Sequence, residues 1–511
     1  MKKLSHLTRI SLMLAAFFSV DKGVAILRQL IIARQFGLSP ALDAFNAANN
    51  LPDLLYAVIS GGALAMAFIP VLSETLTQKG RQEAWDLFSR ITNLVFILTA
   101  ALSLIVALLA DQLVNHVITP GFDPGQKLLV AELMRLNLIA TLIFSLSGLA
   151  MAGLQANQHF LLPAIAPILY NLGQIFGAII LSPDKGYSFG LLTLPAFGMG
   201  VQGLVYGVIL GALLHLCVQI PALIKYQFHW TPRIGIRHPE VLQVLKLLGP
   251  RLFTVLFIQI NFLWRDNLAS GLEAGAVTAL TYGWMMMQVP ETIIGTAIGT
   301  ALLPTLAELY TKQDWVAFKE TVERAVQVLI SITIPVAIIL SFALLPLVKT
   351  AFNFGDQGSL LVVWVTQAYL AGLVGHSLME VAARAFYARQ DARIPLLASG
   401  LSMAAFVVLA LVLVKPFGAV GIALSNSLAF TGEAVFLFYL LNQRLPQKLA
   451  LGSTLLRAIL AGLTGGVLIY LVTGVIPIPL PDLLLTLIGM ALGGMAAVPI
   501  VWKEIRLLVK L

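Results

Sequence analysis

The sequence predicts an all-α membrane protein with about fourteen transmembrane helices, arranged as two parallel six-helix repeats followed by two further helices. Composition, span length and an internal repeat support this fold class. Of the 511 residues, 59% are hydrophobic and only 11% are charged, whereas a soluble domain carries about 25% charged residues. The apolar stretches reach about 20 residues, which is enough to cross a hydrocarbon core about 30 Å thick.

The apolar segments define both the spans and the expected lobes. We expect spans at residues 7–35, 41–75, 84–111, 128–156, 160–182, 198–226, 240–270, 274–309, 317–349, 358–389, 392–414, 417–442, 451–474 and 481–508. The first six spans form a lobe at 1–228, and the next six form a lobe at 229–445. Residues 446–511 hold the two extra helices. The first segment begins with Met1-Lys2-Lys3, but its apolar run continues past Asp21, which favours a membrane helix over a cleaved signal.

Three pairs of similar sequence segments reveal an internal repeat. The octet around Pro70 returns around Pro304, 234 residues later (304 − 70). The segment that ends at Gln158 and precedes Pro163 resembles the segment around Gln390 that precedes Pro395, and the stretch before Gly203 resembles the one before Gly421. Because six is an even number of spans, both lobes start on the same side of the membrane, so the repeat is parallel rather than inverted.

Loop charges predict the orientation. With the N-terminus inside, most of the loop Lys and Arg residues fall on the inner side, and the outer loops hold only Lys127, Lys185, Lys349 and Lys415. The positive-inside rule then places both termini in the cytoplasm of a bacterial inner membrane. These loops also account for the net charge of +8, and no basic run interleaved with aromatics indicates nucleic-acid binding.

The sequence carries no signature of an enzyme. A P-loop, an H-E-x-x-H motif and a credible G-x-S-x-G triad are missing, and the single Cys217 excludes an internal disulfide and a multi-thiolate metal site. We therefore expect no catalysis, no cofactor and no metal site.

Charges within the spans are the candidate functional residues, because an ionisable group in a membrane is expensive unless it is paired or hydrated. They are Asp21, Lys22, Arg28 and Arg34 in the first span, Asp43 and Asp53 in the second, Arg251, Arg265 and Asp266 in the seventh, Glu291 in the eighth, and Glu380 and Arg384 in the tenth. Asp21 and Arg28 are seven residues apart, roughly −20° around a helix, and so share a face. Arg34, near the outer end, can snorkel.

Two interpretations of these charges remain open. In the functional one, Lys22, Arg28, Arg251 and Arg265 line a water-filled cavity between the lobes that accepts an anionic head group, especially a pyrophosphate. In the structural one, they pair with carboxylates such as Asp43 and only hold helices together. For Glu380 and Arg384, four residues apart on one helix, an intrahelical ion pair is favoured.

Four segments resemble the lipid II flippase family, the MurJ or MviN-type proteins of the MOP exporter superfamily. They are Arg28 to Gly37 leading to Leu42-Asp43-Ala44-Phe45, Asn50 to Leu55 followed by Gly62-Ala63 and by Ala67 to Leu72, Gly295 to Leu306, and Phe386 to Asp391 followed by Pro395. The resemblance implies two six-helix lobes around a cationic cavity, with a basic pair at Lys22 and Arg28 and an aspartate at Asp43. It also implies a groove for a polyprenyl tail along the last two helices.

Departures from the family pattern accompany this resemblance. An arginine expected after the Leu-Pro motif is replaced at Tyr56 and Ala57, a glutamate is replaced by Gly61, and an eighth-span arginine is replaced by Met285. Arg251, Arg265 or Arg384 are candidates to supply the lost positive charge.

The resulting hypothesis is a flippase that moves undecaprenyl-pyrophosphate-linked peptidoglycan precursor from the inner to the outer leaflet by alternating access. Its partners are the lipid-linked glycan, membrane lipids, and a monovalent cation or the membrane potential as driver. Asp266, Glu291 and Glu380 are ion-coupling candidates alongside Asp43. The alternatives are an exporter of another lipid-linked oligosaccharide or of a cationic drug, and a non-transporting scaffold on the same fold.

Overall fold

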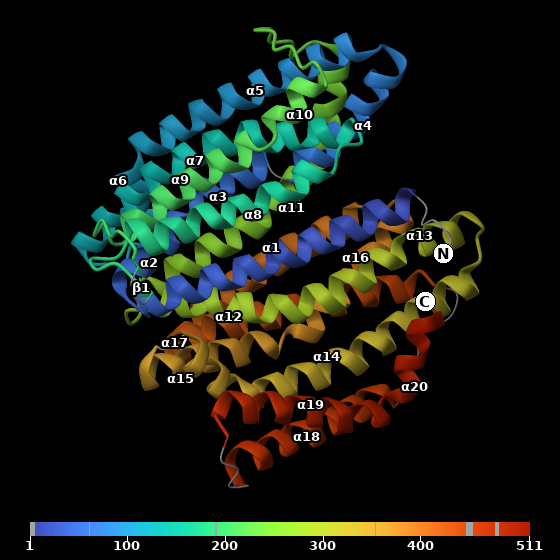
Figure 1. Cartoon of the computed structure of the whole chain (residues 1–511). Coiled ribbons are helices and arrows are strands. Elements are labelled where there is room, and N and C mark those ends of the chain that lie inside the picture. The colour runs from blue at the N-terminus through green and yellow to red at the C-terminus, as the bar shows by residue number, and fades with distance from the viewer. Residues whose placement is uncertain are drawn as a thin grey trace. The chain divides into compact units, whose positions relative to one another are not determined.

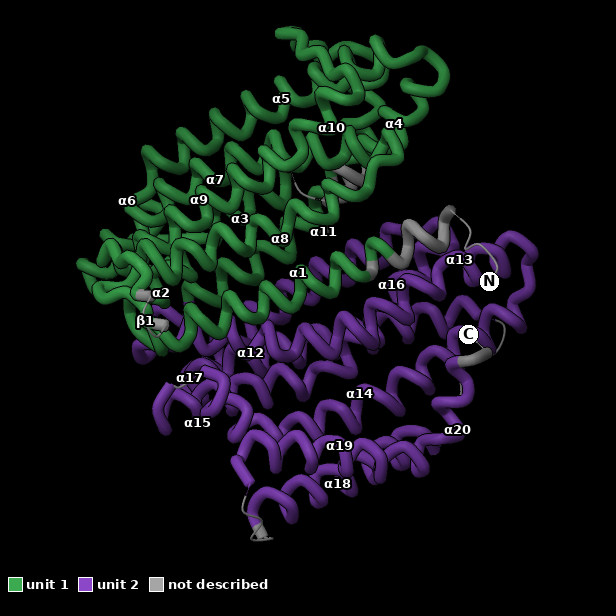
Figure 2. Tube along the Cα trace, in the orientation of Figure 1, with its two compact units in different colours: residues 1–267 green, residues 268–511 purple. Residues whose placement is uncertain are grey.

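The computed structural model describes residues 6–60, 62–189, 192–352, 354–445, 453–475 and 480–510. The chain forms two compact units, residues 1–267 and 268–511 (Figure 2). Within the described ranges each unit is helical, apart from two-residue strands β1 (Ser188–Phe189) and β2 (Leu192–Thr193) that pair antiparallel in unit 1. The prediction of an all-α membrane fold is confirmed.

Unit 1 contains the first seven predicted spans (Figure 1). Its helices are α1 (His6–Phe36), α2 (Pro40–Ala48), α3 (Asn50–Leu55), α4 (Gly62–Gln78), α5 (Arg81–Leu108), α6 (Ala110–Leu113), α7 (Pro124–Ala156), α8 (Leu161–Phe176), α9 (Val201–Cys217), α10 (Ile220–Lys225) and α11 (Pro239–Ala269). The π-helical segments η1 (Tyr56–Ser60), η2 (Val114–Ile118) and η3 (Gly177–Leu181) adjoin them.

Unit 2 contains the remaining predicted spans. Its helices are α12 (Ala276–Glu291), α13 (Ala297–Thr311), α14 (Trp315–Phe352), α15 (Gly355–Leu370), α16 (Leu373–Ala388), α17 (Arg393–Gln443), α18 (Thr454–Tyr470), α19 (Asp482–Ile500) and α20 (Trp502–Ile505). The π segments η4 (Thr292–Thr296) and η5 (Leu471–Val475) and the 3₁₀ turn η6 (Arg506–Lys510) complete it. Here α18 packs on both α14 and α19.

All fourteen predicted segments correspond to helical stretches of the described chain. Ten continuous helices there are long and apolar enough to cross a membrane. The count is four lower for three reasons. The helices α1 and α11 are not among the ten, and the second span is divided among α2, α3, η1 and α4. In addition, α17 contains two predicted spans joined at Gly418, where the backbone is not helical. A proline at 416 precedes this kink, as expected where the helical hydrogen-bond ladder is interrupted.

The backbone repeats along with the sequence. Gly200 and Gly418 adopt nearly the same unusual conformation, with φ of 55° at both and ψ of −137° and −134°. Gln158 and Gln390, both at φ 59°, end corresponding turns. The π segments η1 and η4 each precede a helix with an internal proline, at Pro70 in α4 and Pro304 in α13.

The interiors of the two units are close-packed. In unit 1, Trp85 and Phe88 of α5 pack edge-to-face, with ring centroids 5.5 Å apart. In unit 2, Phe318 and Phe386 are fully buried in the core. A Cβ atom on Gly207 of α9 would lie 2.8 Å from the Gly177 Cα, so these backbones touch through small residues, as in many membrane helix pairs.

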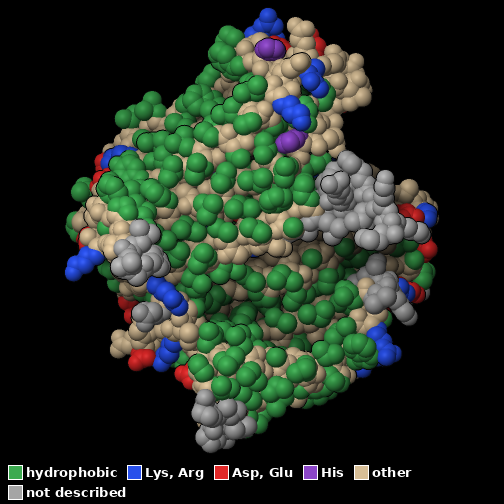
Figure 3. Space-filling view, viewed as in Figure 1, with side chains coloured by type: hydrophobic (Ala, Val, Ile, Leu, Met, Phe, Trp, Pro, Cys, Tyr) green, Lys and Arg blue, Asp and Glu red, His purple; other side chains and the backbone are tan. Residues whose placement is uncertain are grey.

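The outer surface matches a membrane environment. In Figure 3, hydrophobic side chains cover most of the visible face of each unit, and charged side chains gather near the helix ends. Exposed apolar area on this scale marks a surface that contacts lipid or another apolar partner rather than water. The chain is therefore a multi-pass membrane protein.

The boundary between the compact units differs from the limits expected from the sequence repeat. It lies at 267/268, so α11, which corresponds to the seventh predicted span, belongs to unit 1. The repeat-based limits, with lobes at 1–228 and 229–445 and two extra helices at 446–511, stay a prediction.

Candidate functional site

Asp21 and Arg28 of α1 meet at one amide on α8. The Asn171 Nδ2 donates to Asp21 Oδ1 at 2.8 Å, and Arg28 donates from a guanidinium nitrogen to Asn171 Oδ1, also at 2.8 Å. The predicted common face of Asp21 and Arg28 is thus observed. Asn171 is buried in unit 1 and links an anion to a cation across two helices. The sequence reasoning missed it because a single asparagine in an apolar helix carries no charge to attract notice.

The neighbouring basic residues of α1 lie in different surroundings. Lys22 and Arg34 are both exposed. A long side chain at such a position can extend its charged end along an apolar surface toward water. Lys22 is thus accessible to a ligand, whereas Arg28 is held by Asn171.

A second polar network joins α11 to α3. Arg265 Nε donates to Asp266 Oδ1 at 2.7 Å, and Asn50 Nδ2 donates to Asp266 Oδ2 at 2.8 Å. Asp266 is 1% exposed and Arg265 is 8% exposed. This pairing agrees with the structural interpretation of these two charges.

Asp43 and Arg251 complete the predicted residues of unit 1. Asp43 is 1% exposed and lies in the first turn of α2, where Ser39 caps the helix and the helix dipole favours a negative charge. Arg251 lies in α11, but its side chain is outside the described residues.

The predicted residues of unit 2 form a carboxylate-rich group. Glu380 and Arg384 make the expected ion pair on α16, and Arg384 also reaches the Thr300 hydroxyl at 3.4 Å. Glu291, at the end of α12, accepts from the Thr296 hydroxyl at 3.1 Å.

Glu433 is a further buried carboxylate that the sequence reasoning missed. It lies on α17, is 6% exposed and accepts from the Ser399 hydroxyl at 2.8 Å. A glutamate within an apolar span was the available signal, since such groups are functional candidates by default.

The positions that depart from the family pattern are occupied by packed residues or lie outside the described residues. Tyr56 begins the π segment η1 and packs on Phe144, with ring centroids 5.3 Å apart. Met285 lies half-buried in α12, and Gly61 is outside the described residues.

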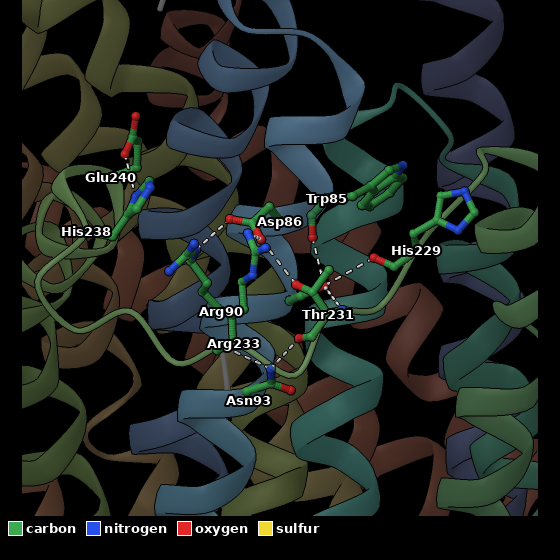
Figure 4. A network of polar contacts seen from close by, with 10 residues as sticks. Trp85, Asp86, Arg90, Asn93, His229, Thr231, Arg233, His238 and Glu240 are labelled. Carbon is green, nitrogen blue, oxygen red and sulfur yellow. Dashed lines mark hydrogen bonds and ion pairs between the residues drawn. The ribbon is translucent and has the colours of Figure 1, made fainter.

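A further polar network holds the segment between α10 and α11 against α5 (Figure 4). Asp86 accepts from Arg90 at 2.6 Å, from the Thr231 hydroxyl at 3.2 Å and from Arg233 at 3.4 Å. Asn93 Nδ2 donates to the backbone carbonyls of Thr231 and Arg233 at 2.8 and 3.0 Å. A cavity of about 730 Å³ adjoins this network. The loop is therefore a fixed part of unit 1.

The model of the family described as "Lipid II flippase MurJ" matches residues 32–485. The chain belongs to this family. The lipid II flippase MurJ of Burkholderia cenocepacia is 32% identical over 400 residues, covering 76% of this chain and 75% of that protein.

Solved structures share the MurJ fold. A lipid II flippase MurJ in an inward closed conformation matches with a TM-score of 0.77 and 19% identity, covering 98% of this chain and all of that one. An inward-facing MATE family multidrug resistance transporter of the MOP superfamily matches with a TM-score of 0.68 and 14% identity, covering 84% of this chain and 98% of its own. The predicted family is confirmed. The named relatives are flippases and transporters rather than catalysts.

Proposed function

We propose that this protein is a lipid II flippase, which moves undecaprenyl-pyrophosphate-linked peptidoglycan precursor from the inner to the outer leaflet by alternating access. Membership of the MurJ family over residues 32–485 is the observation that carries this proposal. Basic side chains within the membrane spans add support, because guanidinium groups bind phosphate oxygens in bidentate fashion. No covalent bond changes in this reaction, so the protein acts as a transporter rather than an enzyme.

The proposed contacts to the head group come from the basic residues of the spans. Exposed Lys22 supplies a point charge, and Arg28, positioned by Asn171, supplies a guanidinium. We retain Asp43, Arg251, Arg265 and Arg384 as further members of this set. Arg265 is buried in an ion pair with Asp266. It can contact the head group only if that ion pair opens.

The energy source is proposed to be an ion gradient or the membrane potential. Moving one elementary charge through 100 mV is worth about 2.3 kcal/mol. Asp266, Glu291 and Glu380 are the candidate ion-coupling residues. The protein is proposed to lie in the bacterial inner membrane with both termini in the cytoplasm, as the loop charges indicate.

Complementation tests this proposal. A bacterium depleted of its own lipid II flippase is expected to grow when this chain is expressed, and growth is expected to fail with Arg28→Ala. Arg34→Ala is the matched control, because it removes the same group from an exposed position of the same helix. Membrane blots establish equal expression of all variants.

The outcomes separate the alternatives. Failure of the well-expressed parent chain would contradict lipid II transport and favour another lipid-linked oligosaccharide, or a scaffold on the same fold. Rescue by Arg28→Ala would leave the transport proposal standing but would remove Arg28 from the binding set.

A further inference from the structure

A pocket of about 300 Å³ lies inside unit 1, apart from the networks of Asp21 and Asp266. Its polar lining residues are Asn49, Asp53 and Tyr56 of the second span, Asn137 and Thr141 of α7, Tyr170 of α8 and His215 of α9. Two further spans complete the wall, since residues of α8 and α9 also line it. The pocket therefore lies between the helices of a bundle, which is a common location for small-ligand sites.

The second span is discontinuous beside this pocket. The helix α2 ends at Ala48, α3 covers only Asn50–Leu55, and the chain then continues through the π segment Tyr56–Ser60. Discontinuous helices in membranes are tolerated where they line a cavity or are buried in protein, and π segments occur frequently at functional sites. The break thus coincides with the polar end of the pocket.

The Asn137 side chain presents an acceptor oxygen there. Asn49 Nδ2 donates to the Phe45 carbonyl at 3.0 Å, which fixes the orientation of the Asn49 amide. Asn137 Nδ2 then donates to Asn49 Oδ1 at 2.8 Å, so the Asn137 amide is fixed as well. Asn137 is 2% exposed, and no donor among the described residues reaches its Oδ1. A buried acceptor left in this state is unfavourable unless a ligand satisfies it.

Thr141 lies one turn further along α7, on the same face. Its hydroxyl donates to the Asn137 carbonyl at 3.3 Å, so the oxygen keeps lone pairs for a ligand. Thr141 is 3% exposed and lines the pocket. The helix α7 thus brings two neutral oxygens to one wall.

Asp53 supplies the negative charge. It lines the pocket and is accessible, and no ion pair joins it to a basic residue of the described chain. Its backbone carbonyl accepts from Gln259 at 3.2 Å, which ties this turn to α11. One carboxylate combined with neutral amide and hydroxyl oxygens is a hard, singly charged ligand set, which favours a small alkali-metal cation over a soft transition metal.

An aromatic row forms the neighbouring wall. Tyr56 and Phe144 have ring centroids 5.3 Å apart, and Phe144 and Tyr170 have centroids 5.0 Å apart. Rings near a cation stabilise it through their quadrupoles. They also keep the site less hydrated than a surface carboxylate would be.

We propose that this pocket binds a monovalent metal cation, with Na⁺ as the probe ion, through the Asp53 carboxylate, Asn137 Oδ1 and Thr141 Oγ1. This site differs from the coupling candidates Asp266, Glu291 and Glu380, and it is independent of the transported substrate. Cation binding can thus be tested separately from lipid II transport.

The test is equilibrium binding of radioactive ²²Na⁺ to the purified full-length protein in lipid nanodiscs at constant ionic strength, with choline as the balancing cation. We expect saturable binding to the parent protein. Asp53→Asn is expected to weaken binding at least tenfold, and Thr141→Val severalfold.

Two matched controls belong to this experiment. Asp111→Asn removes a carboxylate that pairs with Arg135 elsewhere in unit 1. Thr99→Val removes a buried hydroxyl of α5 that makes the same bond to the carbonyl four residues earlier. Both controls are expected to bind Na⁺ as the parent does.

The proposal is overturned if the parent shows no saturable Na⁺ binding, or if the Asp53 and Thr141 variants bind as tightly as their controls. Should Asp53→Asn fail to fold, Thr141→Val and its Thr99 control decide the question alone. Loss of lipid II transport with normal Na⁺ binding would overturn the proposed function and leave this site intact.

Discussion

The two units handle buried charge differently. In unit 1, neutral amides connect charged groups across helices: Asn171 joins Asp21 to Arg28, and Asn50 contacts Asp266 beside Arg265. In unit 2, the ion pair at Glu380 stays within one helix, and Glu291 and Glu433 accept hydrogen bonds from hydroxyl groups.

This difference indicates that the repeated fold does not dictate the charge pattern. The amide bridges of unit 1 hold two helices together and at the same time orient a guanidinium. Glu291 and Glu433 of unit 2 depend on hydroxyl donors, which stabilise an anion less than a cation partner does. We therefore expect unit 1 to lose more stability than unit 2 when its charges are altered.

The largest expected effect is on the buried pair of unit 1. Arg265→Met leaves Asp266 charged and 1% exposed, with Asn50 as a donor. Breaking a buried pair in this way is expected to lower the free energy of unfolding by about 3–5 kcal/mol. Denaturant titration in detergent micelles measures this loss.

The control is the double variant Arg265→Met/Asp266→Leu. It removes both charges and is expected to recover most of the stability, because an apolar replacement of a buried pair is often neutral. Equal losses in the single and double variants would contradict the pairing.

The amide bridge of α8 gives the next effect. Asn171→Leu keeps Asp21 and Arg28 but removes both hydrogen bonds between them, and bonds to charged groups are worth roughly 1.5–3 kcal/mol each. We expect an overall loss of about 2 kcal/mol, less than the sum of two such bonds, because Asp21 and Arg28 are only half-buried and water replaces part of each bond. Asn157→Leu, which removes an amide that donates to the Gly153 carbonyl at 2.9 Å and to no other described residue, is expected to have a smaller effect in the same assay. Equal effects would show that the bridge adds no stability.

A smaller contrast is expected within unit 2. Glu380→Gln deprives Arg384 of its carboxylate and is expected to lower the free energy of unfolding by roughly 1–2 kcal/mol. Glu433→Gln keeps an acceptor for Ser399 and removes a buried charge, so it is expected to be neutral or stabilising. Denaturant titration of both variants measures the two losses in free energy of unfolding. A larger loss for Glu433→Gln than for Glu380→Gln would contradict this prediction.

The smallest expected effects concern the corresponding turns after Gln158 and Gln390. Burial, and then the charge of Lys225, lowers the pKa of His159 below its ordinary value of 6.5. A hydrogen bond from Arg444, 2.7 Å away, lowers the pKa of Asp391 below its ordinary value of 3.8.

Both shifts make the unfolded chain bind protons more readily than the folded protein, so stability falls on acidification. The His159 contribution is complete above pH 6.5 and is lost below it, whereas the Asp391 contribution is lost only below pH 3.8. Each effect is expected to stay under about 1 kcal/mol. His159→Gln should remove the loss between pH 7.5 and 5 only, and Asp391→Asn the loss between pH 5 and 3 only. Thermal melting at these pH values checks the assignment. It would be contradicted if His159→Gln removed the loss between pH 5 and 3, or if Asp391→Asn removed the loss between pH 7.5 and 5.

The sequence predicted the spans well, because membrane thickness imposes a strong length signal on every helix. Pro52 and Pro290 lie close to the observed π segments. The sequence did not indicate the π-helical geometry itself, since that geometry arises from packing between helices. The shared face of Asp21 and Arg28 followed from helical periodicity alone.

The partners of these charges could not be predicted, because they come from residues far away in sequence. Asn171 lies 143 residues from Arg28, and Asn50 lies 216 residues from Asp266. The contacts of Asp86 with the loop around Thr231 are similarly distant. Helical periodicity describes a face but not the helix that covers it.

The most direct test of the account is a measurement of lipid II translocation itself. In cells depleted of their own flippase and expressing this chain, lipid II is exposed to an added enzyme that cleaves it and cannot cross the membrane. The account predicts cleavage with the parent chain and with Arg34→Ala, and protection with Arg28→Ala at equal expression. Lipid II that stays protected with the well-expressed parent chain would contradict it.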